Sequence, residues 1–285
     1  MKQRVVTAIF FAAAMLGGVF GGGFTYFLLF AFITAGSTWE MLGLLMTDED
    51  RFRRFRLVAG SLLAVSFFVL FSGKSLGYWE LYSFEHVFTL LYIPVFGVTA
   101  LMELFLGGKH PFRNIGLYQL ALAYIALPLI LLSQMATFSG ACCATGDVSA
   151  AYHPFRVFGL LLLIWTNDTM AYFVGSQLGR HKLFERISPK KTWEGTVGGG
   201  ICTVLIAWGL SFLIDDFSPV QWVVLGAVAA VLGTLGDLVE SMLKRSVGVK
   251  DSGTLLPGHG GLLDRFDAFI FALPFYWLAL VVLKG

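Results

Sequence analysis

The charged residues whose types and spacing could do chemistry are concentrated between Gly236 and Asp267. This stretch of 32 residues is far more charged than the chain as a whole, of which only 13% is charged. It contains the basic residues Lys244, Arg245, Lys250 and Arg265 and the acidic residues Asp237, Glu240, Asp251, Asp264 and Asp267. Its two ends are typical of helices, whereas the glycines and the proline between Lys250 and Gly261 predict a loop. Charges at the ends of two apolar helices are costly unless they bind something, so the stretch indicates a functional site.

The spacing of these charges suggests metal-assisted transfer at a phosphate group. One face of the first helix would carry Asp237, Ser241, Lys244 and Arg245. Asp264 and Asp267 are three residues apart where the next helix begins, so both can face the same point. Carboxylates that meet from two helices repel one another unless cations lie between them, and Mg²⁺ is commonly shared between carboxylates and substrate phosphates. A network of structural ion pairs is the alternative, but it would not explain the crowding around a glycine-rich loop.

Two other segments carry polar residues that could complete such a site. Asp168 follows Asn167 inside an apolar segment, and an acidic residue in a membrane span is a functional candidate by default. The alternative for Asp168 is a structural hydrogen bond to a neighbouring helix. The sequence SPKKTWE at 188–194 is typical of a helix start, where its hydroxyls and lysines could hold a phosphate. The alternative is that the lysines only anchor a loop at the membrane surface.

Two further groups of residues have less specific patterns. His259 stands between glycines, so the loop backbone can approach a ligand closely. It could bind phosphate or transfer a proton, or it could be a loop histidine bonded to the backbone, and the sequence favours neither. Near the N-terminal end, the basic residues Arg51, Arg53, Arg54 and Arg56 are interpreted as an anchor at the anionic leaflet of a membrane.

The composition predicts the fold that must position these residues. The chain is 57% hydrophobic with a mean hydropathy of +0.77, well above an ordinary soluble domain. We therefore predict an all-α, polytopic integral membrane protein with no separate aqueous domain and no nucleic-acid partner. About 20 apolar residues span a bilayer, and on that template about nine helices are expected. They are placed at 5–21, 24–46, 57–73, 87–107, 115–137, 157–178, 196–214, 219–243 and 262–282. The first two are divided at the glycines 21–23.

The distribution of basic residues predicts the orientation of these helices. With nine spans, seventeen of the 20 Lys and Arg residues fall on the side of the N-terminus. Positive charge is concentrated on the cytoplasmic side of membrane proteins, so the N-terminus is expected inside and the C-terminus outside. We divide the chain into an N-terminal region, 1–150, and a C-terminal catalytic region, 151–285. The catalytic region would expose the loops 179–195 and 244–263 to the cytoplasm.

The charged stretch resembles the C-terminal signature of the phosphatidate cytidylyltransferase (CDP-diacylglycerol synthase) family. The signature comprises a serine, a Lys-Arg pair, a Lys-Asp pair, Pro-Gly-His-Gly-Gly and an Asp-Arg pair with a following Asp. These elements occur here as Ser241, Lys244, Arg245, Lys250, Asp251, Pro257 to Gly261, Asp264, Arg265 and Asp267. The Asn167-Asp168 pair and the segment from Ser188 to Thr192 are also similar to the family. The resemblance covers the C-terminal half, whereas the first 150 residues match only as apolar spans.

The resemblance implies that CTP and phosphatidate react to give CDP-diacylglycerol and pyrophosphate. It implies catalytic roles for Lys244, Arg245, Lys250, Asp251, His259 and Arg265. Substrate would be bound by Asn167, Ser188, Lys190, Lys191, Thr192 and Ser241. Asp237 and Asp264 are expected to be the main ligands of Mg²⁺, with Asp168 and Asp267 as further ligands and room for a second cation. The site would face the cytoplasm from the cytoplasmic (inner) membrane.

Two other functions remain open at this point. A CTP-dependent polyprenol or lipid kinase would transfer the γ-phosphate to an alcohol and would need a base for that hydroxyl. A transporter would also carry charge within its spans, but near the bilayer midplane rather than at one face. The oligomeric state is open as well, because Gly198, Gly199 and Gly200 could pack helices within one chain or in a homodimer.

Overall fold

The computed structural model describes residues 2–46, 51–79, 84–137, 152–255 and 260–284, and these form two compact units. Among them, residues 2–137, Tyr152 and Ser252–Leu263 belong to the first unit. His153–Asp251 and residues 264–284 belong to the second. The division into an N-terminal region, 1–150, and a catalytic region, 151–285, assigns functions to the two regions and stays a prediction.

The first unit is built from long apolar helices. They are α1 (Lys2–Phe20), α2 (Gly23–Leu45), α3 (Arg53–Ser75), α4 (Phe84–Leu106), α5 (Pro111–Ala121) and α6 (Leu127–Thr137), with a π-helical turn at Leu122–Ala126 joining the last two. The expected break between the first two helices is confirmed, because α1 ends before Gly21 and Gly22 adopts a positive φ of 112°. Tyr26, Phe30, Phe68 and Tyr118 are buried in the core of this unit.

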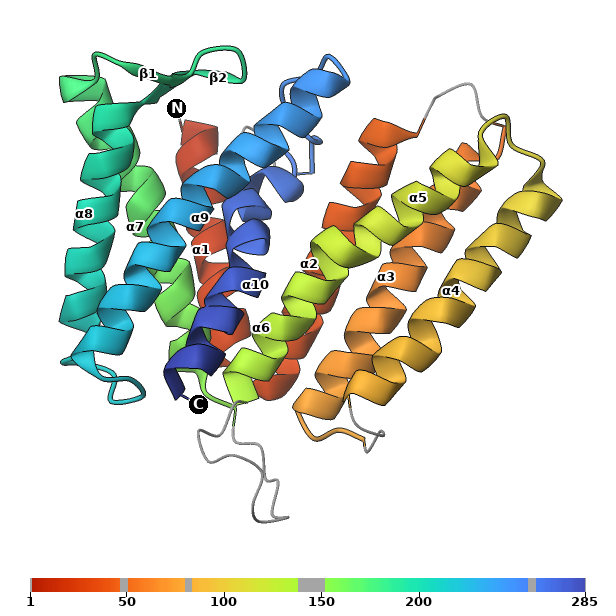
Figure 1. Ribbon diagram of the computed structural model, residues 1–285, viewed down its shortest axis with the longest axis horizontal. Coiled ribbons are helices and arrows are strands. Elements are labelled where there is room, and N and C mark those ends of the chain that lie inside the picture. The colour runs from red at the N-terminus through yellow and green to blue at the C-terminus, as the bar shows by residue number, and fades with distance from the viewer. Residues whose placement is uncertain (1, 47–50, 80–83, 138–151, 256–259, 285) are drawn as a thin grey trace. The chain divides into compact units, whose positions relative to one another are not determined.

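The second unit contains four helices and a small hairpin. They are α7 (Pro154–Leu178), β1 (Lys182–Phe184), β2 (Ser188–Thr192), α8 (Trp193–Leu210), α9 (Pro219–Ser246) and α10 (Leu263–Lys284). The two strands pair antiparallel, with Lys182 opposite Thr192 and Phe184 opposite Ser188. Within this unit, Figure 1 shows α7, α8 and α9 beside one another, with the hairpin at one end of α7 and α8.

The hairpin corrects one expectation from the sequence. Residues 188–192 form a strand rather than the start of a helix, and α8 begins only at Trp193. Pro189 explains the difference, because the residue before a proline is pushed towards extended backbone. Thr192 is the N-cap instead, and its side chain accepts a hydrogen bond from Gly195 N at 3.2 Å.

Helix α8 has two contrasting faces. Val197, Ile201 and Leu205 follow one another at intervals of four residues and are all more than half exposed. Gly195 and Gly199 lie on the face that packs against α7, where a Cβ on Gly195 would lie 2.6 Å from the carbonyl oxygen of Ala171. The backbones of α7 and α8 therefore meet directly, and the apolar stripe on the other face of α8 is left exposed.

Six of the described helices are long and apolar enough to cross a membrane. They are Gly23–Leu45, Arg53–Ser75, Pro111–Thr137, Pro154–Leu178, Pro219–Ser246 and Leu263–Leu283. Shorter apolar helices cover Thr7–Phe20 and Ile93–Leu106. The structure therefore confirms an all-α framework of membrane-type helices, with the hairpin as its one described sheet.

Candidate active site

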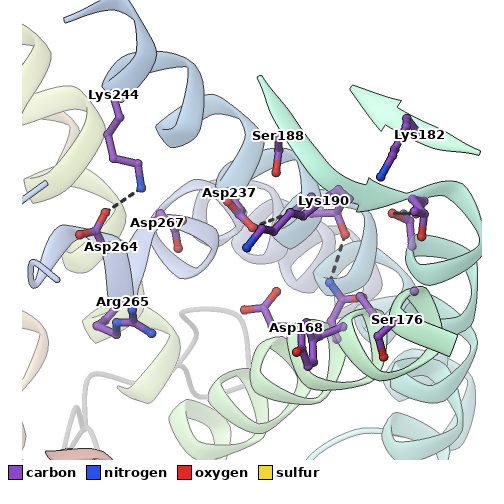
Figure 2. Close-up of a pocket in the computed structure, with 18 of the residues that line it drawn as sticks. Asp168, Ser176, Lys182, Ser188, Lys190, Asp237, Lys244, Asp264, Arg265 and Asp267 are labelled. Carbon is purple, nitrogen blue, oxygen red and sulfur yellow. Dashed lines mark hydrogen bonds and ion pairs between the residues drawn. The ribbon is translucent and has the colours of Figure 1, made fainter. Parts of the chain in front are cut away.

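A pocket of about 640 Å³ lies within the second unit, where α7, the hairpin, α8, α9 and α10 meet. Twelve of the predicted site residues line it, namely Asn167, Asp168, Ser188, Lys190, Lys191, Thr192, Asp237, Lys244, Asp251, Asp264, Arg265 and Asp267. Figure 2 shows the carboxylates of Asp168 on α7, Asp237 on α9 and Asp267 on α10 on different sides of the same space. The structure therefore brings together residues that are up to 100 positions apart in the chain.

Close helix packing on two sides places these carboxylates. Where α7 meets α8, a Cβ on Gly199 would lie 2.9 Å from the carbonyl oxygen of Asn167, the residue before Asp168. Where α9 meets α10, a Cβ on Gly236 would lie 3.0 Å from the Cα of Ala268. Glycine is needed at both positions because any larger residue would push the helices apart. Asp168 and Asp237 are thus carried on helices whose neighbours lie at backbone contact.

Asn167 joins α7 to α9 at the wall of the pocket. Its side chain is buried, and its Nδ2 donates to Thr234 Oγ1 at 3.1 Å. Its Oδ1 has no hydrogen-bond partner among the described residues. A buried polar atom without a partner is costly, so Asn167 has an acceptor left over for a ligand at this pocket.

Lysines pair with two of the five aspartates that line the pocket. Lys191 Nζ lies 2.5 Å from Asp237 Oδ2, and Ser241 donates from Oγ to the other oxygen of Asp237 at 3.2 Å. Lys244 Nζ lies 2.7 Å from Asp264 Oδ1 and also pairs with Glu240, whose side chain is fully buried. The lysines balance the acidic charge, so that the pocket presents cations and carboxylates side by side.

The donor set suits a hard divalent cation. Its ligands would all be oxygens, which Mg²⁺ prefers, and Mg²⁺ is usually held by one or two carboxylates together with substrate phosphates. Within the described ranges, no group of three or more His, Cys, Asp and Glu side chains is arranged to hold a metal ion by itself. A cation at this pocket would therefore need oxygens from a bound phosphate to complete its ligands.

The hairpin is attached to α8 through Glu194. Its carboxylate accepts from the backbone N–H of Arg180 at 3.1 Å and lies 2.6 Å from His181 Nδ1. Hydrogen bonds from its own backbone N–H, from that of Arg180 and from the His181 side chain lower the pKa of Glu194 to about 2. The negative charge also lies in the first turn of α8, where the helix dipole favours it. Glu194 thus ties the residues that lead into β1, and with them Lys182, to the first turn of α8.

Four predicted site residues are not in the lining. Arg245 donates from Nη1 to the carbonyl oxygen of Val249 at 2.7 Å, so it closes the end of α9. Lys250 is exposed and lies outside the pocket lining. Ser241 is also outside the lining, but its hydroxyl donates to Asp237, which lines the pocket. His259 lies outside the described residues. The catalytic or substrate-binding roles of these four residues stay predictions.

Sequence reasoning missed several residues of the pocket. Lys182, Ser176, Thr196 and Thr234 line it, together with Ala171, Tyr172 and Gly175. Tyr172 and Ser176 lie one and two helical turns beyond Asp168, so helical spacing indicates that both share its face of the helix. Lys182 could not be found in this way, because it reaches the pocket through the strand register that sets it opposite Thr192.

Comparison with known proteins relates the whole chain to one family. Residues 2–283 match the profile of the cytidylyltransferase family. A phosphatidate cytidylyltransferase of Staphylococcus aureus is 30% identical over 284 residues, which is 99% of both chains. Proteins of the same name from Staphylococcus epidermidis and Staphylococcus saprophyticus are 32% and 31% identical, each again over 99% of both chains. The match therefore extends through the N-terminal helices, which by their sequence were only generic apolar spans.

Proposed function

Because the chain belongs to the cytidylyltransferase family, we propose that it transfers the cytidylyl group of CTP to phosphatidate, giving CDP-diacylglycerol and pyrophosphate. The observation that carries the proposal is the pocket in which carboxylates from α7, α9 and α10 meet lysines from the hairpin and α9. The full-length similarity to phosphatidate cytidylyltransferases supports phosphatidate as the lipid.

The reaction requires positioning and charge balance more than acid–base chemistry. A phosphate oxygen of phosphatidate attacks the α-phosphorus of CTP, a new P–O–P bond forms, and the bond from the α-phosphorus to the bridging oxygen breaks as pyrophosphate leaves. The attacking oxygen is already ionised at neutral pH, so no strong general base is needed. The obstacle is the approach of one anion to another, and cationic side chains reduce that repulsion.

The residues of the pocket divide into two groups by charge. Lys182, Lys190, Lys191 and Arg265 line the pocket and would hold phosphate oxygens. Asp237 and Asp264 would be the main ligands of Mg²⁺, and Asp168 and Asp267 would be further ligands, with a second cation allowed for. When bound, Mg²⁺ neutralises developing charge on the phosphates and the departing pyrophosphate. Lys191 and Lys244 would meanwhile keep Asp237 and Asp264 oriented towards the pocket.

We further propose that the chain crosses the cytoplasmic membrane nine times, with the N-terminus and the pocket on the cytoplasmic side. Each of the nine expected spans overlaps a helix of the structure, and six of those helices meet the length and hydropathy expected of a span. The distribution of Lys and Arg residues supports the orientation. Cysteines introduced at Lys190 and Lys250 should react with a membrane-impermeant thiol reagent only from the cytoplasmic side. Labelling of these two positions from opposite sides would refute the nine-span topology.

The activity is tested with purified protein, CTP, phosphatidate and Mg²⁺. The expected products are a CDP-lipid that retains the α-phosphate of CTP and one pyrophosphate for each CDP-lipid formed. Diacylglycerol or a polyprenol in place of phosphatidate should give no product. Transfer of the γ-phosphate of CTP to a lipid alcohol, with release of CDP, would instead identify a kinase. Absence of any nucleotide turnover in folded protein would refute an enzymatic role.

A further inference from the structure

An acidic residue of α2, far from the signature in sequence, binds the glycine-rich loop. Glu40 lies inside the apolar helix Gly23–Leu45 and is only 8% exposed. Its carboxylate accepts three hydrogen bonds, from Ser252 Oγ at 3.0 Å, Leu262 N at 2.9 Å and Leu263 N at 2.8 Å. All four residues belong to the first unit. Glu40 therefore holds the loop at Ser252, near its start, and again at Leu262 and Leu263, directly after its glycines.

The loop has glycine at the places where it approaches this carboxylate. A Cβ on Gly253 would lie 2.7 Å from the Glu40 carboxyl carbon, and one on Gly261 would lie 2.8 Å from the same atom. These separations are much shorter than van der Waals contact, so neither position tolerates a side chain unless Glu40 or the loop moves. Gly253 and Gly261 thus have a physical reason to be glycine: they admit a carboxylate from another helix.

The contact also fixes the start of α10. Leu263 is the first residue of that helix, and the N–H groups of Leu262 and Leu263 are among those that a helix leaves unpaired at its beginning. A carboxylate at this end satisfies two of them and interacts favourably with the helix dipole. Asp264, Arg265 and Asp267 follow directly in the first turns of α10, and all three line the pocket.

The other end of the loop leads to the pocket as well. Ser252 follows Asp251 without a break, and Asp251 is also a lining residue. Both ends of the segment held by Glu40 therefore continue directly into residues of the candidate active site. A shift of the loop would be transmitted along the chain to the carboxylates and to Arg265.

We propose that Glu40 is a positioning residue for cytidylyl transfer, which sets the loop ends and the first turn of α10 for the pocket residues that follow. Among the described residues Glu40 makes no hydrogen bond or ion pair to a residue that lines the pocket, so it would act through the backbone at the two ends of the loop. The inference rests on the proposed function, because its readout is the rate of that reaction. A displacement of about 1 Å in a catalytic group can lower a rate about 100-fold, so the expected effect on turnover is large.

The experiment compares Glu40→Ala and Glu40→Gln with a matched control, Glu103→Gln. Glu103 is also a buried carboxylate of the first unit, but its hydrogen-bond partners among the described residues are Arg56, Asn114 and Tyr118 rather than the loop. For each protein, kcat, the KM for CTP, the Mg²⁺ concentration for half-maximal rate and the melting temperature are measured. The control should melt at a lower temperature and keep wild-type kinetic constants.

The Glu40 variants should instead change the kinetics of the folded protein. Glu40→Ala should lower kcat/KM about 100-fold and raise the Mg²⁺ requirement. Glu40→Gln keeps one acceptor oxygen, so its kcat/KM should fall only about tenfold. A merely structural role does not predict this partial rescue. If either variant does not fold, Ser252→Ala removes one of the three hydrogen bonds and should lower kcat/KM about threefold at an unchanged melting temperature.

The outcomes separate this inference from the proposed function. If wild-type protein forms no CDP-lipid, the proposed function fails. If wild-type protein is active and the folded Glu40 and Ser252 variants match it in kcat, KM and Mg²⁺ requirement, only the positioning role is refuted. A fall in kcat/KM for Glu103→Gln equal to that for Glu40→Gln would also refute it, because any buried carboxylate would then have the same effect.

Discussion

Each unit buries charged side chains among apolar helices, but the two clusters differ in access. The closed cluster of the first unit consists of Arg56, Glu103, Asn114 and Tyr118. Arg56 donates from Nε and Nη2 to the two oxygens of Glu103 at 2.7 and 2.8 Å, and the two side chains are 1% and 0% exposed. Asn114 and Tyr118 each add a hydrogen bond to Glu103 at 3.1 Å. Both oxygens of Glu103 are thus occupied by protein donors.

The open cluster of the second unit consists of Asp168, Asp237, Asp264 and Asp267 with Lys191 and Lys244. Here the Lys191–Asp237 pair remains 24% and 32% exposed, and Asp168 makes no hydrogen bond or ion pair to another described residue. The same residue types therefore serve different purposes. A buried carboxylate with both oxygens paired closes a helix bundle, whereas incomplete pairing around an accessible pocket leaves capacity for a ligand.

The sharpest test of this contrast is removal of a carboxylate from the open cluster. Asp237→Asn and Asp264→Asn should each lower cytidylyl transfer about a thousandfold or more, because the amide is nearly isosteric but a much poorer metal ligand. The double variant should be little worse than either single variant, since residues that act as a unit are not additive. Rates are measured with saturating CTP and a Mg²⁺ titration. Near-normal rates and a near-normal Mg²⁺ dependence in well-folded variants would refute the proposed shared-metal site.

The closed cluster should respond in stability rather than in rate. Glu103→Gln leaves the Arg56 charge buried without its counter-charge, which typically costs about 3 kcal/mol. We expect a melting temperature lower by several degrees and unchanged kcat and KM for the folded fraction. Asp237→Asn is prepared and measured in parallel. A Glu103→Gln protein that is stable but inactive would contradict the assignment.

The lysines of the hairpin should have a smaller effect than the carboxylates. Lys190→Ala and Lys191→Ala should raise the KM for CTP or the lipid about tenfold, because each removes one charge-assisted contact to a phosphate. Lys191→Ala should be the more severe, since it also removes the partner of Asp237. Lys74→Ala, in a lysine at the end of α3, serves as the control. Wild-type kinetics in both hairpin variants would show that these lysines do not bind substrate and serve only as membrane anchors.

The smallest effect is expected at Glu194, outside both clusters. Its pKa is lowered from 4.5 to about 2, so its ionised hydrogen bonds stabilise the hairpin above pH 4.5 and are lost as the pH falls towards 2. The melting temperature of wild-type protein should exceed that of Glu194→Gln by a constant margin from pH 5 to 8, and the margin should shrink below about pH 4.5. A margin that grows on acidification would contradict this.

Much of the framework could be predicted because it depends on local signals. Apolar length located the helices, the glycines at 21–23 marked the first break, and Pro219 begins α9 where the span was expected. The strand at Ser188–Thr192 was missed because a helix start and a short strand share polar residues ahead of an apolar run. Arg56 was interpreted as a surface anchor, and this was wrong, because its side chain is buried and bonded to Glu103. No local pattern indicates this pair, since Glu103 lies 47 residues away.

The candidate site shows the same limit. Asp168, Asp237, Asp264 and Asp267 could be selected because acid in an apolar helix is rare. By that rule Glu40 should also have been selected, since it lies in the expected span 24–46, but its role depends on a loop more than 200 residues away. Arg245 was placed on the same helical stripe as Lys244. Its side chain instead bonds the carbonyl oxygen of Val249, in the turn that follows α9. Basic side chains in the last turn of a helix often bond carbonyl groups at its end.

The glycine face of α8 has a consequence for how the protein enters the membrane during synthesis. Glycine adds little apolar surface, so the residues that let α8 meet α7 also make it a weak insertion signal, and α8 is not among the six helices that meet the length and hydropathy expected of a span. As one of the nine proposed spans, α8 would gain its place in the bilayer from its neighbours rather than from its own hydrophobicity. Its biogenesis would be cooperative: α7 would have to be present to receive it, and a chain released before α9 would hold α8 only loosely.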